Sequence, residues 1–338
     1  HGRWRTVGMP LLSQVRLPRG AAPDELISAS LDKVLREAGY GHRIGSNIHM
    51  RHGKFENEAQ AIIDFVKKKS PRNGRSIFAL DQFGYRAVPT SLIKKILNTL
   101  PGAEVILTFA VDSFLNFADE KNFNSGLKRL QLPDLLAGRT LREIKASDKD
   151  WRLLIQSTLY ASLVQQCGAK HYTPFFVRNK SGHGDYWLIH LSQHHRARDV
   201  MTDVHWKNQN YFIHYGGAGL NMFNMLGYDP KFDSAHHGQS ELGFEFDPLA
   251  REASVRTLME QIPKVVFAHE EGVSYGVLYA TTCNDSPASG EIYQEALERL
   301  VAHGAVEIVG EDGVKRRAAK QIKTSDQIIA PTQKSFFF

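Results

Sequence analysis

Apolar positions along the chain follow two periods, one typical of buried strands and one typical of helices. Residues 76–80 and 103–111 are nearly continuous apolar runs bounded by polar residues, as expected of strands that are buried on both faces of a sheet. Between them, residues 91–100 have helical spacing and end at Pro101-Gly102, a common stop signal. A strand, a helix and a second strand in succession predict a right-handed crossover and a parallel sheet.

Two amphipathic helices are predicted upstream of this unit, because residues 24–39 and 58–69 both repeat apolar side chains at three- and four-residue spacing. A short strand is predicted between them, at residues 47–51. The first 23 residues are basic, rich in glycine and proline, and without clear periodicity.

The middle of the chain predicts a helical insertion at residues 113–145, an amphipathic helix at 151–166 and then a hairpin. The strands of the hairpin, at 171–178 and 186–191, are joined by Asn-Lys-Ser-Gly-His-Gly, a composition that favours antiparallel pairing. A parallel sheet that ends in an antiparallel hairpin is how Rossmann-like methyltransferases complete their sheet. The pattern therefore predicts an α/β, Rossmann-like domain, followed by a helix at 196–208.

The pattern changes after residue 254. Three helices are predicted at 254–268, 275–282 and 289–303, and a hairpin with an Asp312-Gly313 turn is predicted at 305–320. Helices followed by a hairpin are typical of a winged helix. The predicted organisation is thus a methyltransferase-like domain at 1–209, a Gly-, Asn- and His-rich linker at 210–253, and a small α+β winged-helix domain at 254–330.

Composition narrows the class of protein. Of 338 residues, 42% are hydrophobic and 23% are charged, which is a soluble, globular balance, and no run approaches the length of a membrane span. Two widely spaced cysteines exclude a disulfide framework or a four-cysteine zinc site and suit a reducing compartment. Without a secretory pattern at the start, a cytoplasmic protein is predicted. A net charge of +6 is compatible with a nucleic-acid partner.

The first candidate for chemistry is Asp81-Gln82-Phe83-Gly84-Tyr85, directly after the strand at 76–80. Ligands of open α/β sheets bind beyond the carboxyl ends of strands. In enzymes that methylate bases, a polar residue here accepts hydrogen bonds from the target amine, and an aromatic residue stacks on the extruded base. Asp81 is the candidate for the first role, and Phe83 or Tyr85 for the second. The alternative is a turn in which Asp81 caps the next helix and Phe83 packs into the core.

Three further segments are weaker candidates. Residues 52–56 have a position suited to contact the adenine of a nucleotide cofactor, although an ordinary strand–helix loop is favoured. Residues 215–219 are glycine-rich, but no acidic residue follows at the spacing of a dinucleotide site, so a flexible loop is favoured. A group of histidines lacks a zinc-binding spacing, so no metal site is predicted and polar or core roles are favoured. The group comprises His190, His194, His195, His205, His214, His236 and His237.

The predicted wing is basic, and the third helix of the winged helix is acidic. Phosphate contacts are expected from the wing. Glu291, Glu295 and Glu298 lie on the exposed face of the helix, which suits the major groove poorly because it meets a negative field. Dimerisation or docking to a protein partner therefore stays as open as reading of nucleic acid, and the oligomeric state is left open. The predicted nucleic-acid-binding residues are Lys315, Arg316, Arg317 and Lys320.

With these residues in view, the chain resembles the three-Cys-motif partner family, whose members are methyltransferase-like and carry a C-terminal winged helix. The resemblance rests on residues 77–85, on the Glu-containing strand at 103–107, on segments 1–4 and 8–12, and on the wing. It implies S-adenosylmethionine as cofactor, a nucleic-acid substrate, and an origin in bacterial or phage-linked gene clusters. On this basis, cofactor contacts are expected from Gly2, Gly53, Phe55, Asp81 and Gln82.

One departure from the family divides the hypotheses. The first strand with its glycine loop, and a second strand ending in an acid, are not seen in the sequence, and Gln82 stands where the family has proline. Either residues are missing near the start or the cofactor site has decayed. The first hypothesis is a methyltransferase that uses S-adenosylmethionine and acts on nucleic acid. The second is a non-catalytic scaffold that binds nucleic acid or protein, and a third is a metal-dependent enzyme built on the histidines.

Overall fold

The computed structural model describes residues 23–49, 51, 54–82, 88–109, 120–132, 135–147, 151–178, 185–208, 212–214, 220 and 244–331. The chain divides into two compact units, His1–Gln60 and Ala61–Phe338, and each is considered on its own. None of the described helices is both long enough and apolar enough to cross a membrane.

The first unit contains α1, Pro23–Glu37, which confirms the first predicted helix. The strand predicted at 47–51 is wrong for its described residues, because this segment curls back on itself. The amides of Asn47 and Ile48 both donate to the carbonyl of Arg43, each at 2.9 Å, and Gly45 has a positive φ of 84°. The helix α2, Phe55–Lys69, begins in this unit and ends in the second.

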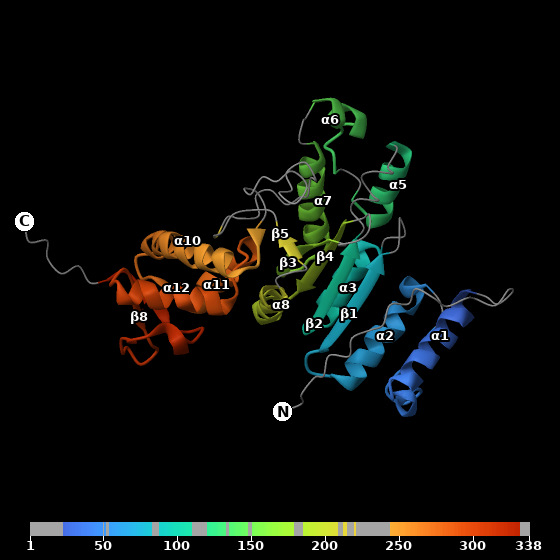
Figure 1. The fold of residues 1–338 in the computed structure, drawn as a ribbon, viewed down its shortest axis with the longest axis horizontal. Helices are drawn as coiled ribbons and strands as arrows, with labels where there is room; N and C mark the ends of the chain where they lie inside the picture. The colour runs from blue at the N-terminus through green and yellow to red at the C-terminus, as the bar shows by residue number, and fades with distance from the viewer. Residues whose placement is uncertain are drawn as a thin grey trace, which may run out of the picture. The chain divides into compact units, whose positions relative to one another are not determined.

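The parallel strand pair predicted from the sequence is present in the second unit. Strands β1, Ser76–Gln82, and β2, Ala103–Phe109, are parallel and are connected through α3, Thr90–Thr99 (Figure 1). β2 buries Val105 and Leu107. The expected burial of both faces of β1 is wrong, because Ile77 is 67% exposed. In the described sheet β1 is an edge strand, so it lacks a neighbour on one side.

The predicted hairpin is also present, but the sheet does not end there. Strands β3, His171–Arg178, and β4, Asp185–Ser192, pair antiparallel, and β4 is inserted between β2 and β3. Because β4 is antiparallel to both neighbours, β3 runs in the same direction as β1 and β2. Two short strands from the predicted linker, β5, Phe212–His214, and β6, Phe244–Glu245, extend the sheet beyond β3.

Helices accompany this sheet as the sequence pattern indicates. The predicted insertion contains α5, Glu120–Leu130, and α6, Leu141–Ser147. The helix α7, Trp151–Cys167, packs against α3 and leads into β3. The helix α8, His195–Lys207, follows β4 and contacts both β3 and β4, and so lies against the sheet (Figure 1).

Residues 244–331 contain a three-helix module with its own core and a small sheet. The first helix, α10, Pro248–Phe267, starts six residues before the predicted position, because Asp247 caps it by accepting the amide of Ala250 at 2.7 Å. The other helices are α11, Tyr275–Thr282, and α12, Gly290–Ala302, with the 3₁₀ turn η4, Cys283–Asp285, between them. The strands are β7, Val273–Ser274, β8, Glu307–Val309, and β9, Gln327–Ile329, in the order β7-β9-β8.

The predicted return strand of the wing hairpin, at residues 314–320, is wrong, because β8 pairs with a later segment. Residues 314–320 make only an isolated bridge, between Val309 and Lys315, and the strand that pairs with β8 is β9. The reason is burial, because Ile328 of β9 is fully buried opposite Ile308. The wing therefore spans residues 310–326 and includes the 3₁₀ turn η5, Ala319–Gln321.

The first prediction concerns the glycine that leads into β7. Gly272 has a φ of 74°, and a Cβ there would overlap the carbonyl oxygen of Ile328 in β9. Gly313, in the wing, has a φ of 72° but open space around it. We expect Gly313→Ala to lower the free energy of unfolding by about 1–2 kcal/mol, the penalty for a left-handed residue, and Gly272→Ala to lower it at least twice as much. Urea unfolding of both variants measures the difference. Equal losses in the free energy of unfolding would contradict the close approach of β9 to Gly272.

Candidate nucleic-acid interface

The turn between α11 and α12 is buried against α8, the helix that follows β4. Arg198 of α8 is fully buried, and its guanidinium donates to the carbonyl of Ala288 at 2.8 Å, to the carbonyl of Ser286, and to the hydroxyl of Tyr279 at 3.3 Å. Hydrogen bonds offset the cost of burying a charge, and here both terminal nitrogens of the guanidinium find acceptors, whereas Nε has none among the described residues. Arg198 therefore fixes the turn of the three-helix module onto the sheet domain.

Further hydrogen bonds reinforce the same junction. The indole of Trp206, two turns after Arg198, donates to the carbonyl of Pro287 at 2.9 Å. From the sheet, the amide of Tyr172 donates to the side chain of Asn284 at 3.2 Å, and the Asn284 amide group donates to the carbonyl of Lys170 at 2.8 Å. Residues 286–290 are all buried as a result.

The amino terminus of α12 is occupied by a carboxylate of the same chain. Asp199 of α8 accepts the amide of Gly290 at 2.6 Å and the hydroxyl of Tyr279 at 2.9 Å. A Cβ at residue 290 would lie only 3.0 Å from the second Asp199 oxygen, so glycine suits this position. Helix amino termini often bind phosphate through free amides and the helix dipole. Here that role is already filled by Asp199.

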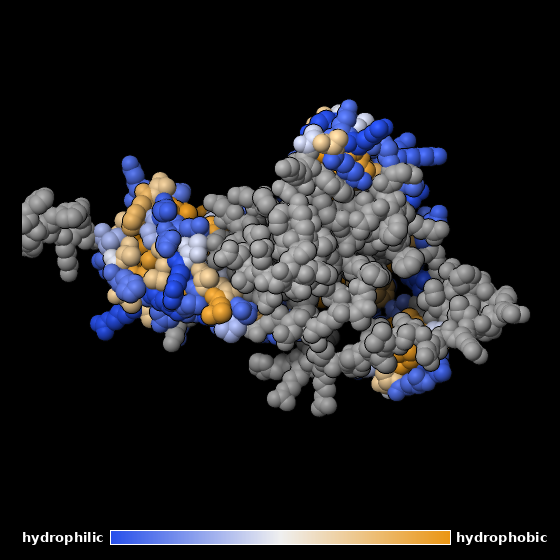
Figure 2. All heavy atoms as spheres, turned by 45° about the horizontal axis from the view of Figure 1, so that its top comes forward, coloured by the Kyte–Doolittle hydropathy of each residue, from blue (hydrophilic) through white to orange (hydrophobic). Residues whose placement is uncertain are grey.

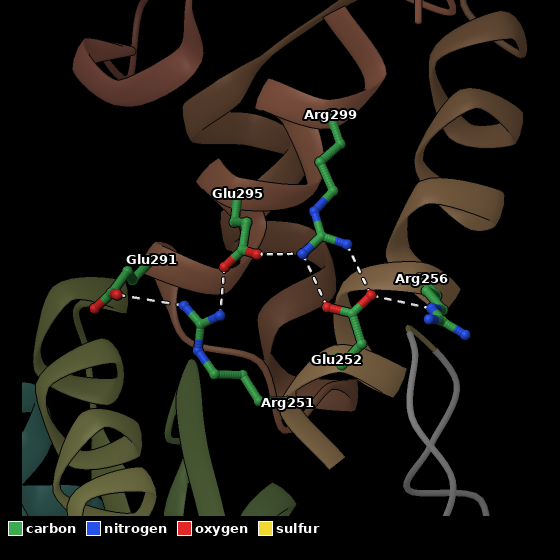
Figure 3. Close-up of polar contacts among 6 residues, drawn as sticks. All are labelled: Arg251, Glu252, Arg256, Glu291, Glu295 and Arg299. Atoms are coloured by element: carbon green, nitrogen blue, oxygen red, sulfur yellow. Dashed lines mark hydrogen bonds and ion pairs between the residues drawn. The ribbon is translucent and has the colours of Figure 1, made fainter. Parts of the chain in front are cut away.

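The exposed face of α12 is joined to α10 by a chain of ion pairs, which we call the ion-pair ladder (Figure 3). Arg299 makes a bidentate pair with Glu252 of α10, both contacts at 2.8 Å, and also binds Glu295 at 2.6 Å. These contacts lower the pKa of Glu252 to about 2, chiefly through the hydrogen bonds from Arg299 and then Arg256. In order, the ladder runs through Glu291, Arg251, Glu295, Arg299, Glu252 and Arg256.

The ladder accounts for two of the three glutamates on the acidic helix face noted in the sequence, whereas Glu298 is not part of it. Glu291 and Glu295 are paired with arginines of α10 and α12, so this face has mixed charge and is committed to internal contacts. On the face shown in Figure 2, hydrophilic and hydrophobic side chains are interspersed over the described surface of the module. Docking of a protein partner on α12 stays a prediction.

The wing contains the four basic residues predicted to bind phosphate, and they differ in their surroundings. Arg316 binds the buried carboxylate of Asp326 at 2.5 and 2.7 Å, which lowers the pKa of Asp326 and closes the wing on itself. Lys315 is exposed but pairs with Glu307 at 2.6 Å. Arg317 is exposed, and Lys320 lies in η5, with its side chain outside the described part.

The predicted acceptor site lies partly inside the described residues. Asp81 and Gln82 are the last residues of β1, opposite Thr108 and Phe109 of β2, so they stand at the carboxyl ends of two parallel strands, as the sequence predicted. Phe83, like Tyr85, lies outside the described residues. The roles of these side chains remain predictions.

Only some of the residues predicted to contact the cofactor lie within the described part of the chain. Gly2 and Gly53 lie outside the described residues. Phe55, which is half-buried, opens α2 in the first unit, whereas Asp81 and Gln82 belong to the second.

Some of the histidines contact one another, because the rings of His194 and His195 stack with centroids 4.5 Å apart and His171 lies edge-on to His195 at 5.9 Å. His190 is buried and its Nε2 lies 2.8 Å from Glu104 of β2, while His194 caps α8 by accepting the amide of Arg196 at 3.1 Å. Burial, and then the nearby positive groups, lowers the pKa of His171 to about 4. Within the residues that the structure describes, no three His, Cys, Asp or Glu side chains are grouped to hold a metal ion. The side chain of His214, the pair His236-His237 and residues 215–219 lie outside that part.

The residues that make the junction were not predicted from the sequence. The helix at 196–208 was predicted without a partner, although Arg198, Thr202 and His205 follow helical spacing and all are buried. A charged residue on an otherwise uncharged stripe of a helix is the signal that points to a buried, hydrogen-bonded charge.

Comparison with known proteins agrees with the architecture of this module. The family model described as the GMT-like wHTH domain matches residues 227–313, which include α10, α11, α12 and the start of the wing. The predicted C-terminal winged helix is therefore confirmed, and this domain class suggests nucleic-acid binding. No curated protein and no solved structure matches the chain.

The second prediction tests the junction. Arg198→Met keeps most of the side-chain volume but leaves two buried carbonyls without their donor. We expect a loss of about 3 kcal/mol or more in the free energy of unfolding. Arg196→Met, at an exposed position on the same helix, is the matched control and should change it by less than about 0.5 kcal/mol. Similar values for the two variants in urea unfolding would contradict the role of Arg198.

Proposed function

We propose that this protein binds duplex nucleic acid through the wing of its winged-helix domain. The observation that carries the proposal is the winged-helix match at residues 227–313. Winged helices and related helix–turn–helix domains commonly insert the third helix into the major groove. In this chain the proposal places the contact elsewhere, for two structural reasons.

The first reason is that the third helix is closed at its amino end. Asp199 accepts the amide of Gly290, the first residue of α12, and the preceding turn is buried against α8. The second reason is charge, because the exposed face of α12 carries Glu291 and Glu295 in the ion-pair ladder. A phosphate backbone laid along this face would meet carboxylates and would have to break the ladder.

The wing carries exposed positive charge, in contrast to the carboxylates on α12. Lys315 and Arg317 are exposed, and the Arg316–Asp326 pair holds the loop that carries them. Cations on a held loop favour contacts to phosphates rather than to base edges, so we expect weak sequence preference and strong salt dependence.

The third prediction tests the wing. The double variant Lys315→Ala, Arg317→Ala removes two exposed cations and leaves Arg316 in place. We expect weaker binding of a fluorescent duplex in an anisotropy titration, and a plot of log K against log salt that is flatter by about 1 to 2 units of slope. Lys207→Ala, Lys264→Ala removes the same charge from exposed positions on α8 and α10 and is the control. Equal effects of the two double variants would reject the wing as the contact.

A second candidate function is methyl transfer to nucleic acid at the carboxyl end of β1. It is favoured by the strand order, in which antiparallel β4 lies between β2 and the parallel β3. This arrangement is similar to the completed sheet of Rossmann-like methyltransferases, and the resemblance to the three-Cys-motif partner family points the same way. The alternative is a scaffold in which the sheet domain has lost catalysis.

The described residues supply the acceptor end of such a site but do not by themselves fit S-adenosylmethionine. Asp81 and Gln82 end β1, yet no glycine-rich turn follows a strand of the sheet within the described residues. No chemical step is therefore assigned through this cofactor. The proposed part of Asp81 is to accept a hydrogen bond from the acceptor amine and so orient it.

The fourth prediction separates enzyme from scaffold. For an enzyme, calorimetry should detect S-adenosylmethionine binding to the purified chain, and labelled methyl groups should be transferred to nucleic acid. Asp81→Ala should abolish transfer while the thermal unfolding midpoint is retained. Glu260→Ala, at an exposed position on α10, is the control and should be fully active. Transfer that survives in Asp81→Ala would reject the assignment, and no cofactor binding by this chain would favour the scaffold.

A further inference from the structure

We propose that the edge of the sheet where β1, β2 and β3 begin, the amino-terminal edge, is a second contact for the phosphate backbone of bound duplex; this rests on the proposed nucleic-acid binding. Residues 67–75 contain five lysines and arginines and no carboxylate. They form the last turn of α2 and the turn into β1. Arg72 and Arg75 are exposed there.

The topology brings two more cations to the same edge. Ser192 at the end of β4 lies opposite Glu104 of β2 and His171 of β3. Lys170, which precedes β3, therefore lies on the same edge as Arg75, which precedes β1. With β2 and β4 between them, β1 and β3 are three strand spacings apart, about 14 Å. Lys94 of α3 extends along Gly168, since a Cβ there would lie 3.4 Å from the Lys94 Cγ.

The backbone that carries these side chains is well held. The backbone amide of Gly74 donates to the carbonyl of Ser70 at 2.8 Å, and the backbone amide of Arg75 donates to the Ser70 hydroxyl at 3.0 Å. The amide of Lys170 donates to the carbonyl of Ser192 at 3.2 Å. Because the protein backbone is already ordered here, binding of a phosphate backbone costs little conformational entropy.

A purely structural role explains only part of this cluster. Lysines in the last turn of α2 stabilise the helix dipole, which accounts for residues 67–69. It does not account for Arg72, Arg75, Lys94 and Lys170, none of which is in an ion pair within the described residues. The carboxylate that β2 contributes near this edge, Glu104, is already engaged by His190.

The spacing suits a duplex. About 14 Å of duplex axis carries roughly eight phosphate charges, so four cations spread over that length can each meet a phosphate. Two of the four side chains come from the turn before β1, one from α3 and one from the residue before β3. We therefore assign them to the backbone of the duplex, where they add affinity without sequence preference.

The fifth prediction uses the full chain and three matched variants. The edge variant carries Arg72→Gln, Arg75→Gln, Lys94→Gln and Lys170→Gln. The charge-retaining variant carries Arg72→Lys, Arg75→Lys, Lys94→Arg and Lys170→Arg. The control variant carries Lys121→Gln, Lys128→Gln, Arg139→Gln and Arg142→Gln, which are exposed positions on or beside α5 and α6. Thermal unfolding of each checks that the fold is retained.

Duplex binding is measured by anisotropy over a series of salt concentrations. We expect the edge variant to flatten the plot of log K against log salt by about 3 units of slope, and the other two variants to keep the wild-type slope. An edge variant that behaves like the control, while the wild type still binds, overturns this inference and leaves the proposed function intact. A wild-type chain that does not bind duplex overturns both, and binding to phosphatidylserine vesicles instead would assign the edge to a membrane surface.

Discussion

The rest of the described architecture depends on one buried charge, the guanidinium of Arg198. An ion of this size costs several kcal/mol to remove from water, and the cost is offset only if its donors find acceptors. The carbonyls of Ser286 and Ala288 are those acceptors, and both belong to the turn of the winged helix. The turn is therefore held on α8, because the guanidinium and these carbonyls satisfy one another away from water only while the two are in contact.

This constraint decides which surfaces are left for a partner. With the turn held, Asp199 reaches the amino terminus of α12, and the face of the same helix is tied to α10 by the ion-pair ladder. The helix that commonly reads nucleic acid in such domains is thus closed by its own chain. Exposed cations lie on the wing and along the amino-terminal edge of the sheet, and both groups suit phosphates better than bases. This distribution favours binding that depends on salt more than on sequence.

The sequence predicts the elements better than it predicts their neighbours. The strands at β1 and β2, the hairpin and the three helices of the winged helix follow from periodicity and turn composition, which are local signals. The return strand of the wing was misplaced, because only the burial of Ile328 against β8 selects β9 over the basic segment before it. The pairing of β4 with β2, and of Arg198 with Ser286, joins residues about 80 to 90 positions apart. No local pattern encodes such a contact. At the candidate acceptor site, the position of Asp81 at a strand end was predictable, whereas the surroundings of its side chain were not.

We propose that the turn and the third helix stay covered while the wing binds the nucleic acid. Amide hydrogen exchange on the full chain, with and without duplex, tests this proposal. We expect slow exchange at residues 286–293 in both samples and new protection at residues 310–325 when duplex is added. Fast exchange at 286–293 in the free chain, followed by protection there on adding duplex, would contradict it. That result would mean that α8 releases the turn and that α12 is the contact.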